Sequence, residues 1–309
     1  MHPLPNLSSE LGVDLWIKRD DLTGFALGGN KARKLEYLAP AIRTSGATHV
    51  VTCGSLQSNF VRQMGGLGLL EGFHVTAVVM EMPYEGDAKP SGLSVGALGG
   101  NTAIDEVMGV NLILIPDGTW DELALAAHKE AERLRASGLK VYEVPVGGSV
   151  PQGVYGFLKA GEELERQVEE PFDSVVTASS SGSTQTGLAM WFKGTDTRVI
   201  GIACDPEPEL PHDLAALSAQ LCTLLDWGEA LKAEDLEFLL DWVGPGYNIP
   251  SKAGAEAMET LMRKEGILLD PIYSGKAFAG LLDLIKSGTI GGRICFWHTG
   301  GIPTLFAHA

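Results

Sequence analysis

The chain has 309 residues, of which 45% are hydrophobic and 20% charged, and its formal net charge at pH 7 is −16. This length and composition predict a globular protein with a large core, divided into two lobes. The negative charge argues against nucleic acid or an anionic membrane as a partner, so an anionic small substrate would need a local cationic pocket.

The spacing of the cysteines indicates the redox state of the thiols, and the length of the apolar runs bears on whether the chain crosses a membrane. The four cysteines are far apart and show no CxxC spacing, which argues against a disulfide framework or a zinc site. No apolar run reaches the roughly 18 residues that cross a bilayer, and no leader pattern opens the chain. We therefore expect a soluble, cytoplasmic protein with reduced thiols, and we interpret Cys53 and Cys295 as core residues.

Strand-like apolar segments alternate with segments of helical periodicity along nearly the whole chain. The expected strands are residues 14–18, 50–53, 75–80, 112–115, 141–144, 174–178, 198–203 and 293–297. The expected helices are residues 31–46, 57–70, 93–108, 120–136, 154–168, 184–193, 212–225, 252–265 and 276–287, and a short helix follows Gly301. This alternation predicts an α/β fold with mostly parallel sheets.

Ligands bind such sheets beyond the carboxyl ends of the strands. The candidate loops are those that follow strands, namely residues 54–58, 145–149, 179–184 and 298–301.

A glycine pair at residues 28–29 places Lys31 in the first turn of an expected helix, closely followed by Arg33 and Lys34. A lysine with an ordinary pKa is a poor nucleophile at pH 7, so a reactive lysine needs a desolvated, cationic setting that lowers its pKa. We expect Arg33 and Lys34 to supply part of that setting. The alternative is an exposed helix start with ordinary solvated lysines.

Residues 179–187 form a loop of small and hydroxyl-bearing residues between a strand and a helix. Such a loop suits a small anion, because the N–H groups of a helix N-terminus point at it. The loop has neither the Walker A lysine nor the GxGxxG pattern, so a phosphate monoester is the favoured ligand. A helix cap rich in Ser and Thr is the alternative here, as it is for Ser58 and Asn59 after the strand 50–53.

Two tyrosines, Tyr247 and Tyr273, lie beside glycine or proline in expected loops, where a tyrosine can exchange a proton with a substrate or be structural. His298 ends a strand and is interpreted either as a general base or, more simply, as a hydrogen-bonded core residue. The sequence shows no metal-ligand spacing and no Gly-x-Ser-x-Gly elbow.

Over nearly its whole length the chain resembles the pyridoxal-phosphate enzymes of the D-cysteine desulfhydrase and 1-aminocyclopropane-1-carboxylate (ACC) deaminase family. The motifs that carry the resemblance are residues 18–22, 28–37, 57–59 with 62–63, 182–185, 244–247, 270–273 with 275–276, and 298–301. The resemblance implies fold type II, like the tryptophan synthase β subunit, with two domains of mostly parallel twisted sheets flanked by helices. It further implies a larger domain of residues 1–33 and 146–309, a smaller inserted domain of residues 34–145, pyridoxal 5'-phosphate as cofactor, no metal and a homodimer.

The resemblance also implies a role for each matching residue. Lys31 matches the Schiff-base lysine, Asn59 the partner of the cofactor's ring oxygen, and Thr299 the hydroxyl that faces the pyridine nitrogen. The phosphate site is matched by Lys34, Ser181, Gly182, Ser183 and Thr184. The catalytic set is matched by Lys31, Ser58 near the substrate carboxylate, and the tyrosines Tyr247 and Tyr273.

Four positions bear on the substrate: Ser58, Phe60, Ser274 and Thr299. ACC deaminases of this family carry glutamate and leucine where this chain has Ser274 and Thr299, so the desulfhydrase pattern is favoured. The expected reaction is β-elimination, with D-cysteine giving pyruvate, ammonia and hydrogen sulfide. Phe60 departs from the histidine of the desulfhydrases and the glutamine of the deaminases, which leaves the β-substituent open. ACC deaminase, cysteate sulfo-lyase and racemase activities are the alternatives on this frame, and a non-catalytic binding protein is the least favoured.

Overall fold

A six-stranded sheet forms the larger half of the computed structural model, which describes residues 1–308. Its strands lie in the order β1 (His2–Pro3), β2 (Asp14–Arg19), β11 (Arg293–His298), β8 (Ser174–Ser179), β9 (Arg198–Ala203) and β10 (Glu237–Leu239). All neighbours pair in parallel except β1 and β2. Such a sheet is covered on both faces, and its central strands β8 and β11 are accordingly buried along almost their whole length.

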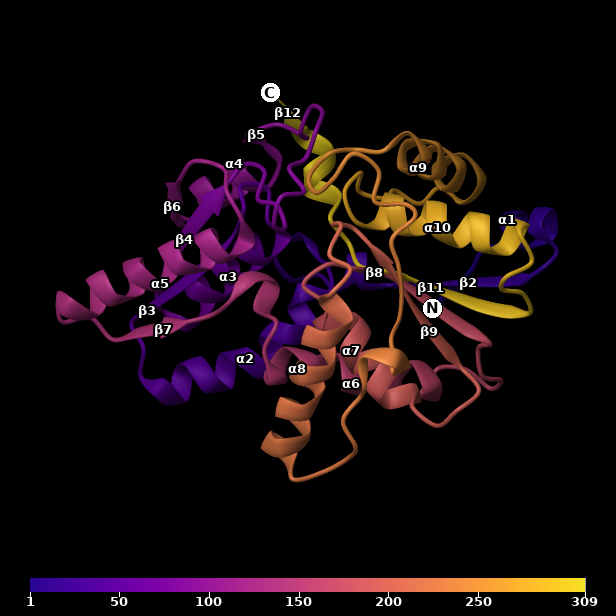
Figure 1. The fold of residues 1–309 in the computed structure, drawn as a ribbon, viewed down its shortest axis with the longest axis horizontal. Coiled ribbons are helices and arrows are strands. Elements are labelled where there is room, and N and C mark those ends of the chain that lie inside the picture. The colour runs from indigo at the N-terminus through magenta and orange to yellow at the C-terminus, as the bar shows by residue number, and fades with distance from the viewer. Residues whose placement is uncertain (309) are drawn as a thin grey trace.

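Helices cover both faces of this sheet (Figure 1). On one face Phe296 of β11 packs in a core with α1 (Pro5–Leu11), α9 (Lys252–Glu265) and α10 (Ser274–Lys286). On the other face Trp297 packs against Phe157 of α6 (Pro151–Arg166), with ring centroids 6.0 Å apart, and α7 (Ser183–Phe192) lies beside it. The helix α8 (Leu210–Leu225) packs outside α6 and α7.

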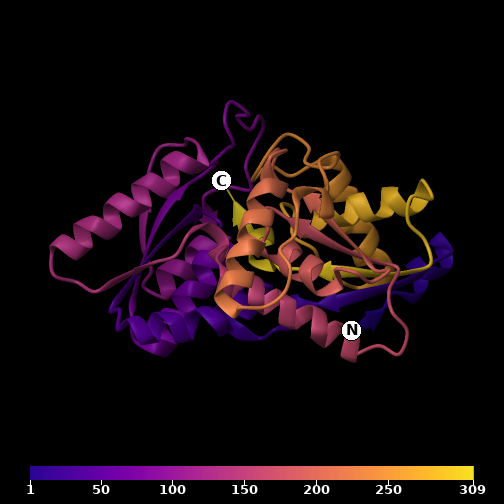
Figure 2. The same ribbon diagram turned by 60° about the horizontal axis from the view of Figure 1, so that its bottom comes forward.

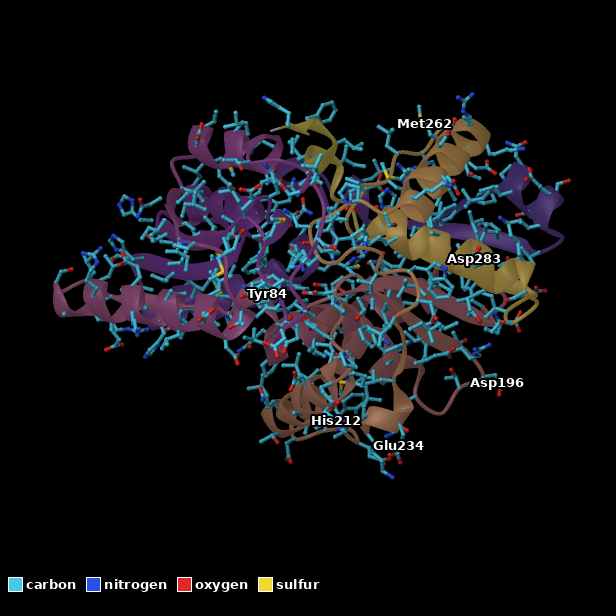
Figure 3. All side chains as sticks on the ribbon, turned by 45° about the horizontal axis from the view of Figure 1, so that its top comes forward. Tyr84, Asp196, His212, Glu234, Met262 and Asp283 are labelled. Carbon is cyan, nitrogen blue, oxygen red and sulfur yellow. The ribbon has the colours of Figure 1, made fainter. Side chains whose placement is uncertain are left out.

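A second, four-stranded parallel sheet has the order β6 (Asn111–Leu114), β4 (His74–Met80), β3 (His49–Ser55) and β7 (Val141–Glu143). The helices α2 (Lys31–Ser45) and α3 (Asn59–Glu71) cover one face, and α5 (Trp120–Ala136) covers the other. Figures 1 and 2 show this sheet and its helices beside the larger half, with α2 reaching from one to the other. Side chains fill the layers between sheets and helices (Figure 3).

The observed fold confirms the predicted α/β class and every predicted strand, with ends shifted by a few residues. The short strands β1, β10, β5 (Leu98–Gly99) and β12 (Ala307–His308) and the helix α1 were not predicted. Cys53 and Cys295 are buried, as expected. The domain limits at residues 34 and 145 stay a prediction, and they enclose all four strands of the smaller sheet.

The helix predicted over residues 93–108 is wrong in its first half. The helix α4 spans only Gly100–Val107, because Leu98 and Gly99 pair with β12. Gly99 has a φ of 67° and Gly100 a φ of 52°, a backbone conformation that glycine adopts without strain. The short helix predicted after Gly301 is a 3₁₀ helix over Ile302–Phe306. Among residues 1–308 no helix is long and apolar enough to span a bilayer.

Candidate active site

One cavity lies where the two halves of the molecule meet. All four loops that the sequence singled out contribute residues to its lining, among them Ser58, Gly147, Gly182 and Thr299. The loops that follow the parallel strands therefore meet at one cavity, as the rule for such sheets predicts.

Four helices begin at this cavity. Asn30, Ser58, Gly182 and Tyr273 directly precede α2, α3, α7 and α10, and all four line it. Each helix N-terminus carries free N–H groups and a partial positive charge. The cavity can therefore hold an anionic ligand although the protein as a whole is strongly acidic.

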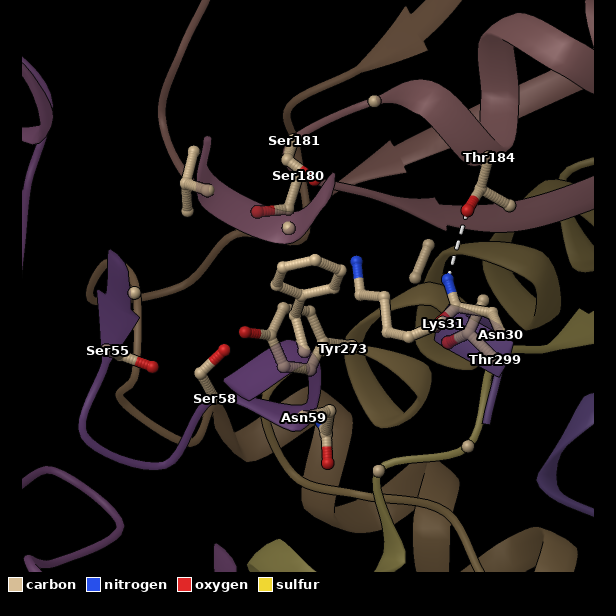
Figure 4. Close-up of a pocket in the computed structure, with 18 of the residues that line it drawn as sticks. Asn30, Lys31, Ser55, Ser58, Asn59, Ser180, Ser181, Thr184, Tyr273 and Thr299 are labelled. Carbon is tan, nitrogen blue, oxygen red and sulfur yellow. Dashed lines mark hydrogen bonds between the residues drawn. The ribbon is translucent and has the colours of Figure 1, made fainter. Parts of the chain in front are cut away.

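The start of α2 is fixed on several sides, so that Lys31 points into the cavity toward Ser180 and Ser181 (Figure 4). The side chain of Asn30 donates to Thr184 Oγ1 over 3.0 Å, and its backbone N–H donates to Thr299 O over 2.9 Å. Gly28 has a φ of 71°, and a Cβ atom there would lie 2.0 Å from Asp21 O. The turn that places Lys31 at the start of α2 therefore requires glycine at position 28.

Lys31, which is partly buried, and Lys34, which is fully buried, form a pair of neighbouring amines. Burial lowers the pKa of Lys31 to about 8. Burial, together with the charge of Lys31, holds the pKa of Lys34 well below its ordinary value. The Lys34 amine donates to Gly147 O over 2.9 Å, and no carboxylate contributes to the pKa of either lysine. The pair therefore combines a nucleophilic amine with a site for an external anion.

The expectation that Arg33 would help to lower the pKa of Lys31 is wrong. Arg33 lies outside the cavity lining, where its Nε is 2.8 Å from Asp20 Oδ2 and its Nη1 is 2.7 Å from Glu163 Oε2. Burial opposes its charge, but the two carboxylates outweigh that effect and raise the pKa of Arg33. A helix turns about 100° per residue, so Arg33 points away from the face that Lys31 and Lys34 share.

The serine loop is held in place by close packing and by hydrogen bonds. Gly182 has a φ of 77°, and a Cβ atom there would lie 1.9 Å from Leu214 Cδ2. Ser149 Oγ donates to Ser181 O over 2.6 Å and so holds the loop against the segment around Gly147. Ser181, Gly182 and Thr184 line the cavity, whereas the Ser183 side chain is buried outside the lining, 3.3 Å from Ser149 Oγ.

Hydroxyl groups gather on the opposite wall. Tyr247 OH hydrogen-bonds Tyr273 OH and lies 3.2 Å from Ser55 Oγ. Burial raises the pKa of both tyrosines, so both stay protonated at neutral pH. Ser58 Oγ caps α3 by accepting from Val61 N over 3.3 Å, which confirms the capping interpretation without removing Ser58 from the cavity.

Phe60 and Thr299 line the cavity, whereas Ser274 does not. Phe60 is only 1% exposed, and a Cβ atom on Gly148 would lie 2.5 Å from its ring. Ser274 Oγ donates to Asp270 Oδ2 over 2.5 Å and accepts from Asp270 N over 2.8 Å. Its effect on substrate choice would have to pass through Asp270 or through the adjacent Tyr273.

No role was predicted for four residues of the lining that carry polar side-chain atoms: Asn30, Ser55, Trp120 and Ser180. The Trp120 ring packs edge-on to Tyr247 with centroids 5.1 Å apart, and its Nε1 donates to Asp205 Oδ2 over 2.7 Å. A Thr119–Glu122 capping box marks the start of α5 in the sequence, but nothing local shows that this helix end faces Tyr247.

His298 is a core residue, as the simpler interpretation had it. Its Nε2 lies 2.7 Å from Leu268 O, and its Nδ1 accepts from Gly300 N over 3.2 Å. Burial lowers the pKa of the imidazole, which keeps the ring neutral. Among the described residues there is no cluster of metal-ligand side chains.

A family model described as "Pyridoxal-phosphate dependent enzyme" matches residues 1–300. The chain belongs to the pyridoxal-phosphate-dependent enzymes. This enzyme is 36% identical over 317 aligned residues to the D-cysteine desulfhydrase of Salmonella newport strain SL254, covering 99% of the chain and 92% of the relative. The D-cysteine desulfhydrase of Salmonella typhi matches equally well.

Solved structures show the same fold type II architecture. An ACC deaminase homologue matches the enzyme with a TM-score of 0.87 and 35% identity, covering 99% of this chain and 90% of that one. A hydrogen sulfide-producing enzyme from Fusobacterium nucleatum matches with a TM-score of 0.66 at 17% identity, covering 94% of this chain and 92% of that one, and shows the shared fold alone.

Proposed function

We propose that this enzyme is a carbon–sulfur lyase that converts D-cysteine and water to pyruvate, ammonia and hydrogen sulfide. The observation that carries the proposal is the composition of the cavity wall. Lys31, whose pKa is lowered, faces the same cavity as the protonated tyrosines Tyr247 and Tyr273, and no carboxylate occurs in the lining that the structure describes. The identity to curated D-cysteine desulfhydrases over the whole chain supports the same reaction.

The residues present fit pyridoxal phosphate. The phosphate would lie at the N-terminus of α7, against Ser181, Gly182 and Thr184, and its negative charge would favour the protonated form of Lys34. Lys31 would carry the cofactor covalently, Asn59 would contact its ring oxygen, and Thr299 would face its pyridine nitrogen. When bound, the cofactor withdraws electrons from the substrate's α-carbon and so makes its proton removable.

The protein's own groups divide the remaining work. Ser58 and the N-terminus of α3 bind the substrate carboxylate. The Lys31 amine takes the α-proton, since a pKa of about 8 leaves part of it neutral at pH 7. Tyr273, hydrogen-bonded to Tyr247, is placed to give a proton to the departing sulfur. A protonated tyrosine suits this step, because a neutral thiol leaves more easily than a thiolate.

ACC deamination is the second candidate, because the ACC deaminase homologue shares 35% identity with this chain. Ser274 favours the desulfhydrase: its hydroxyl is engaged with Asp270, so no carboxylate projects at this position beside Tyr273. Phe60 leaves the β-substituent open, since its apolar ring lines the cavity. We also propose that the enzyme is a cytoplasmic homodimer, which sedimentation of the purified protein and cell fractionation would test.

A substrate panel tests the proposal. The purified enzyme, loaded with cofactor, is assayed for keto acid release from D-cysteine, L-cysteine, D-cysteate and ACC. We expect pyruvate and sulfide in equal amounts from D-cysteine and little 2-oxobutanoate from ACC. Release of 2-oxobutanoate from ACC without pyruvate from D-cysteine would assign the deaminase reaction instead.

A further inference from the structure

The amide of Asn59 is held in one orientation. Asn101 Nδ2 donates to the backbone oxygen of Gln57 over 2.8 Å, and a carbonyl can only accept, so this atom of Asn101 is the nitrogen. The same nitrogen lies 3.0 Å from the Asn59 side chain, and Arg62 Nη2, which is also only a donor, lies 3.5 Å from that same atom. The atom that meets both donors must be the Asn59 oxygen.

The other end of the Asn59 amide therefore carries the N–H groups. Figure 4 shows the Asn59 oxygen on the side of the residue away from Lys31, and Asn59 lines the cavity. An asparagine held in this way presents a donor, and not an acceptor, to a ligand. If the Asn59 amide were rotated by 180°, its N–H groups would face the donors of Asn101 and Arg62. Both hydrogen bonds between these buried groups would then be lost.

The residues of this arrangement lie on α3 and α4, three or four positions apart along each helix. Asn59 and Arg62 lie three residues apart on α3, and Asn101 and Asp105 lie four residues apart on α4, so each pair shares one helix face. Arg62, Asn101 and Asp105 are fully buried. The charge of Asp105 acts to raise the pKa of Arg62, although burial outweighs it. The two helices thus meet in a polar seam behind the cavity.

The seam also reaches the loop that delivers Lys31. Arg62 donates to Ala26 O and, through Nη2, to Gly28 O over 3.0 Å. Gln63 Nε2 donates to Gly28 O over 2.5 Å. One buried guanidinium therefore connects the Asn59 oxygen with the turn before the lysine.

We propose that Asn101 is a positioning residue, which with Arg62 fixes the Asn59 amide so that its N–H group donates to the ring oxygen of the bound cofactor. The inference rests on the cofactor contact proposed above for Asn59. A donor at the ring oxygen stabilises its ionised form, so the orientation of Asn59 should affect both cofactor affinity and the pH at which the bound cofactor's absorption changes.

A double-mutant cycle tests the proposal, with pyridoxal 5'-phosphate titrated into the full-length protein after its removal. In the wild-type background Asn101→Leu removes one donor and should weaken cofactor binding about tenfold, with a shifted absorption pH profile. In the Asn59→Ala background the same change should alter affinity less than about twofold. If the Leu variant does not fold, Asn101→Ser serves in its place.

The matched control is Thr102→Val on the same turn of α4. Thr102 accepts from Gln57 Nε2 over 3.0 Å and donates to Leu56 O over 3.2 Å, but makes no hydrogen bond to Asn59. We expect its affinity and pH profile to match the wild type. An Asn101 effect that persists without Asn59, or no Asn101 effect at all, would overturn the inference. The cycle uses no substrate, so its failure is separate from a failure of the D-cysteine assay.

Discussion

Two groups of cations lie near the start of α2, in opposite electrostatic settings. Lys31 and Lys34 face the cavity, and no carboxylate acts on their lowered pKa values. Arg33 faces the other way, into ion pairs with Asp20 and Glu163, and Lys18 is paired with the same Glu163. Arg33 shares the start of α2 with Lys31 and Lys34, whereas Lys18 lies on β2, so the three cations of α2 differ because the helix turns them toward different neighbours.

This contrast shows what distinguishes a cation that can lose its proton from one that stays charged. An opposite charge nearby favours the charged form, whereas burial without such a partner disfavours it. Arg33 is therefore a fixed charge that ties α2 to the larger sheet through Asp20, which also accepts from Trp297 Nε1 over 2.8 Å. Lys31 can lose its proton and Lys34 can exchange Gly147 O for an external anion.

The largest expected effect comes from removing the reactive amine. Lys31→Ala should lower turnover of D-cysteine by roughly a thousandfold or more, because both the covalent and the proton-transfer roles are lost. After borohydride reduction of the loaded wild type, mass spectrometry should find the cofactor on the peptide that contains Lys31. The control Lys34→Gln should keep this label while binding the cofactor more weakly. A label on Lys34 would contradict the assignment of roles.

The next largest effect should appear in stability and not in chemistry. Arg33→Gln leaves Asp20, which is 1% exposed, without its cationic partner, and should lower the free energy of unfolding by about 3 kcal/mol. Urea denaturation measures this change. Arg43→Gln, which breaks an exposed pair with Glu71, should leave the unfolding midpoint nearly unchanged. Loss of the cofactor's absorption band in Arg33→Gln would show that the two groups are not separate.

The smallest effect concerns pH. With its pKa lowered to about 8, about a tenth of Lys31 is neutral at pH 7, so the rate of cofactor uptake by the stripped enzyme should rise with pH and level off above about 8. Between pH 8 and 10.5 Lys31 binds more protons in the unfolded chain than in the folded protein. The contribution of Lys31 to the free energy of unfolding therefore rises with pH over this range. Stopped-flow absorbance follows uptake. If the uptake rate instead rose with a midpoint near pH 10.5, burial would not lower the pKa of Lys31.

Many residues that line the cavity could be predicted from the sequence, because they belong to short motifs whose residues are close together in the chain. The glycine turn before Lys31, the serine loop after β8 and the loop after β3 all lie at strand-to-helix connections, where parallel sheets place ligands. Arg33 was assigned to the wrong face, although helical periodicity alone would have separated it from Lys31 and Lys34. Ser274 was expected to affect the substrate because it follows Tyr273 in the chain, but its hydroxyl donates to Asp270 and lies outside the cavity lining.

From the sequence alone we could predict the alternation of strands and helices, the lysine after the glycine pair and the family of the enzyme, since each depends on residues close together in the chain. The side chains that surround this lysine became known only from the folded structure. Trp120 lines the cavity from the smaller sheet's side, where Asn101 lies behind Asn59, and Tyr247 and Tyr273 line it from the larger sheet's side. Such contacts join residues far apart in sequence, so their partners are set by how the two halves pack and not by any local pattern.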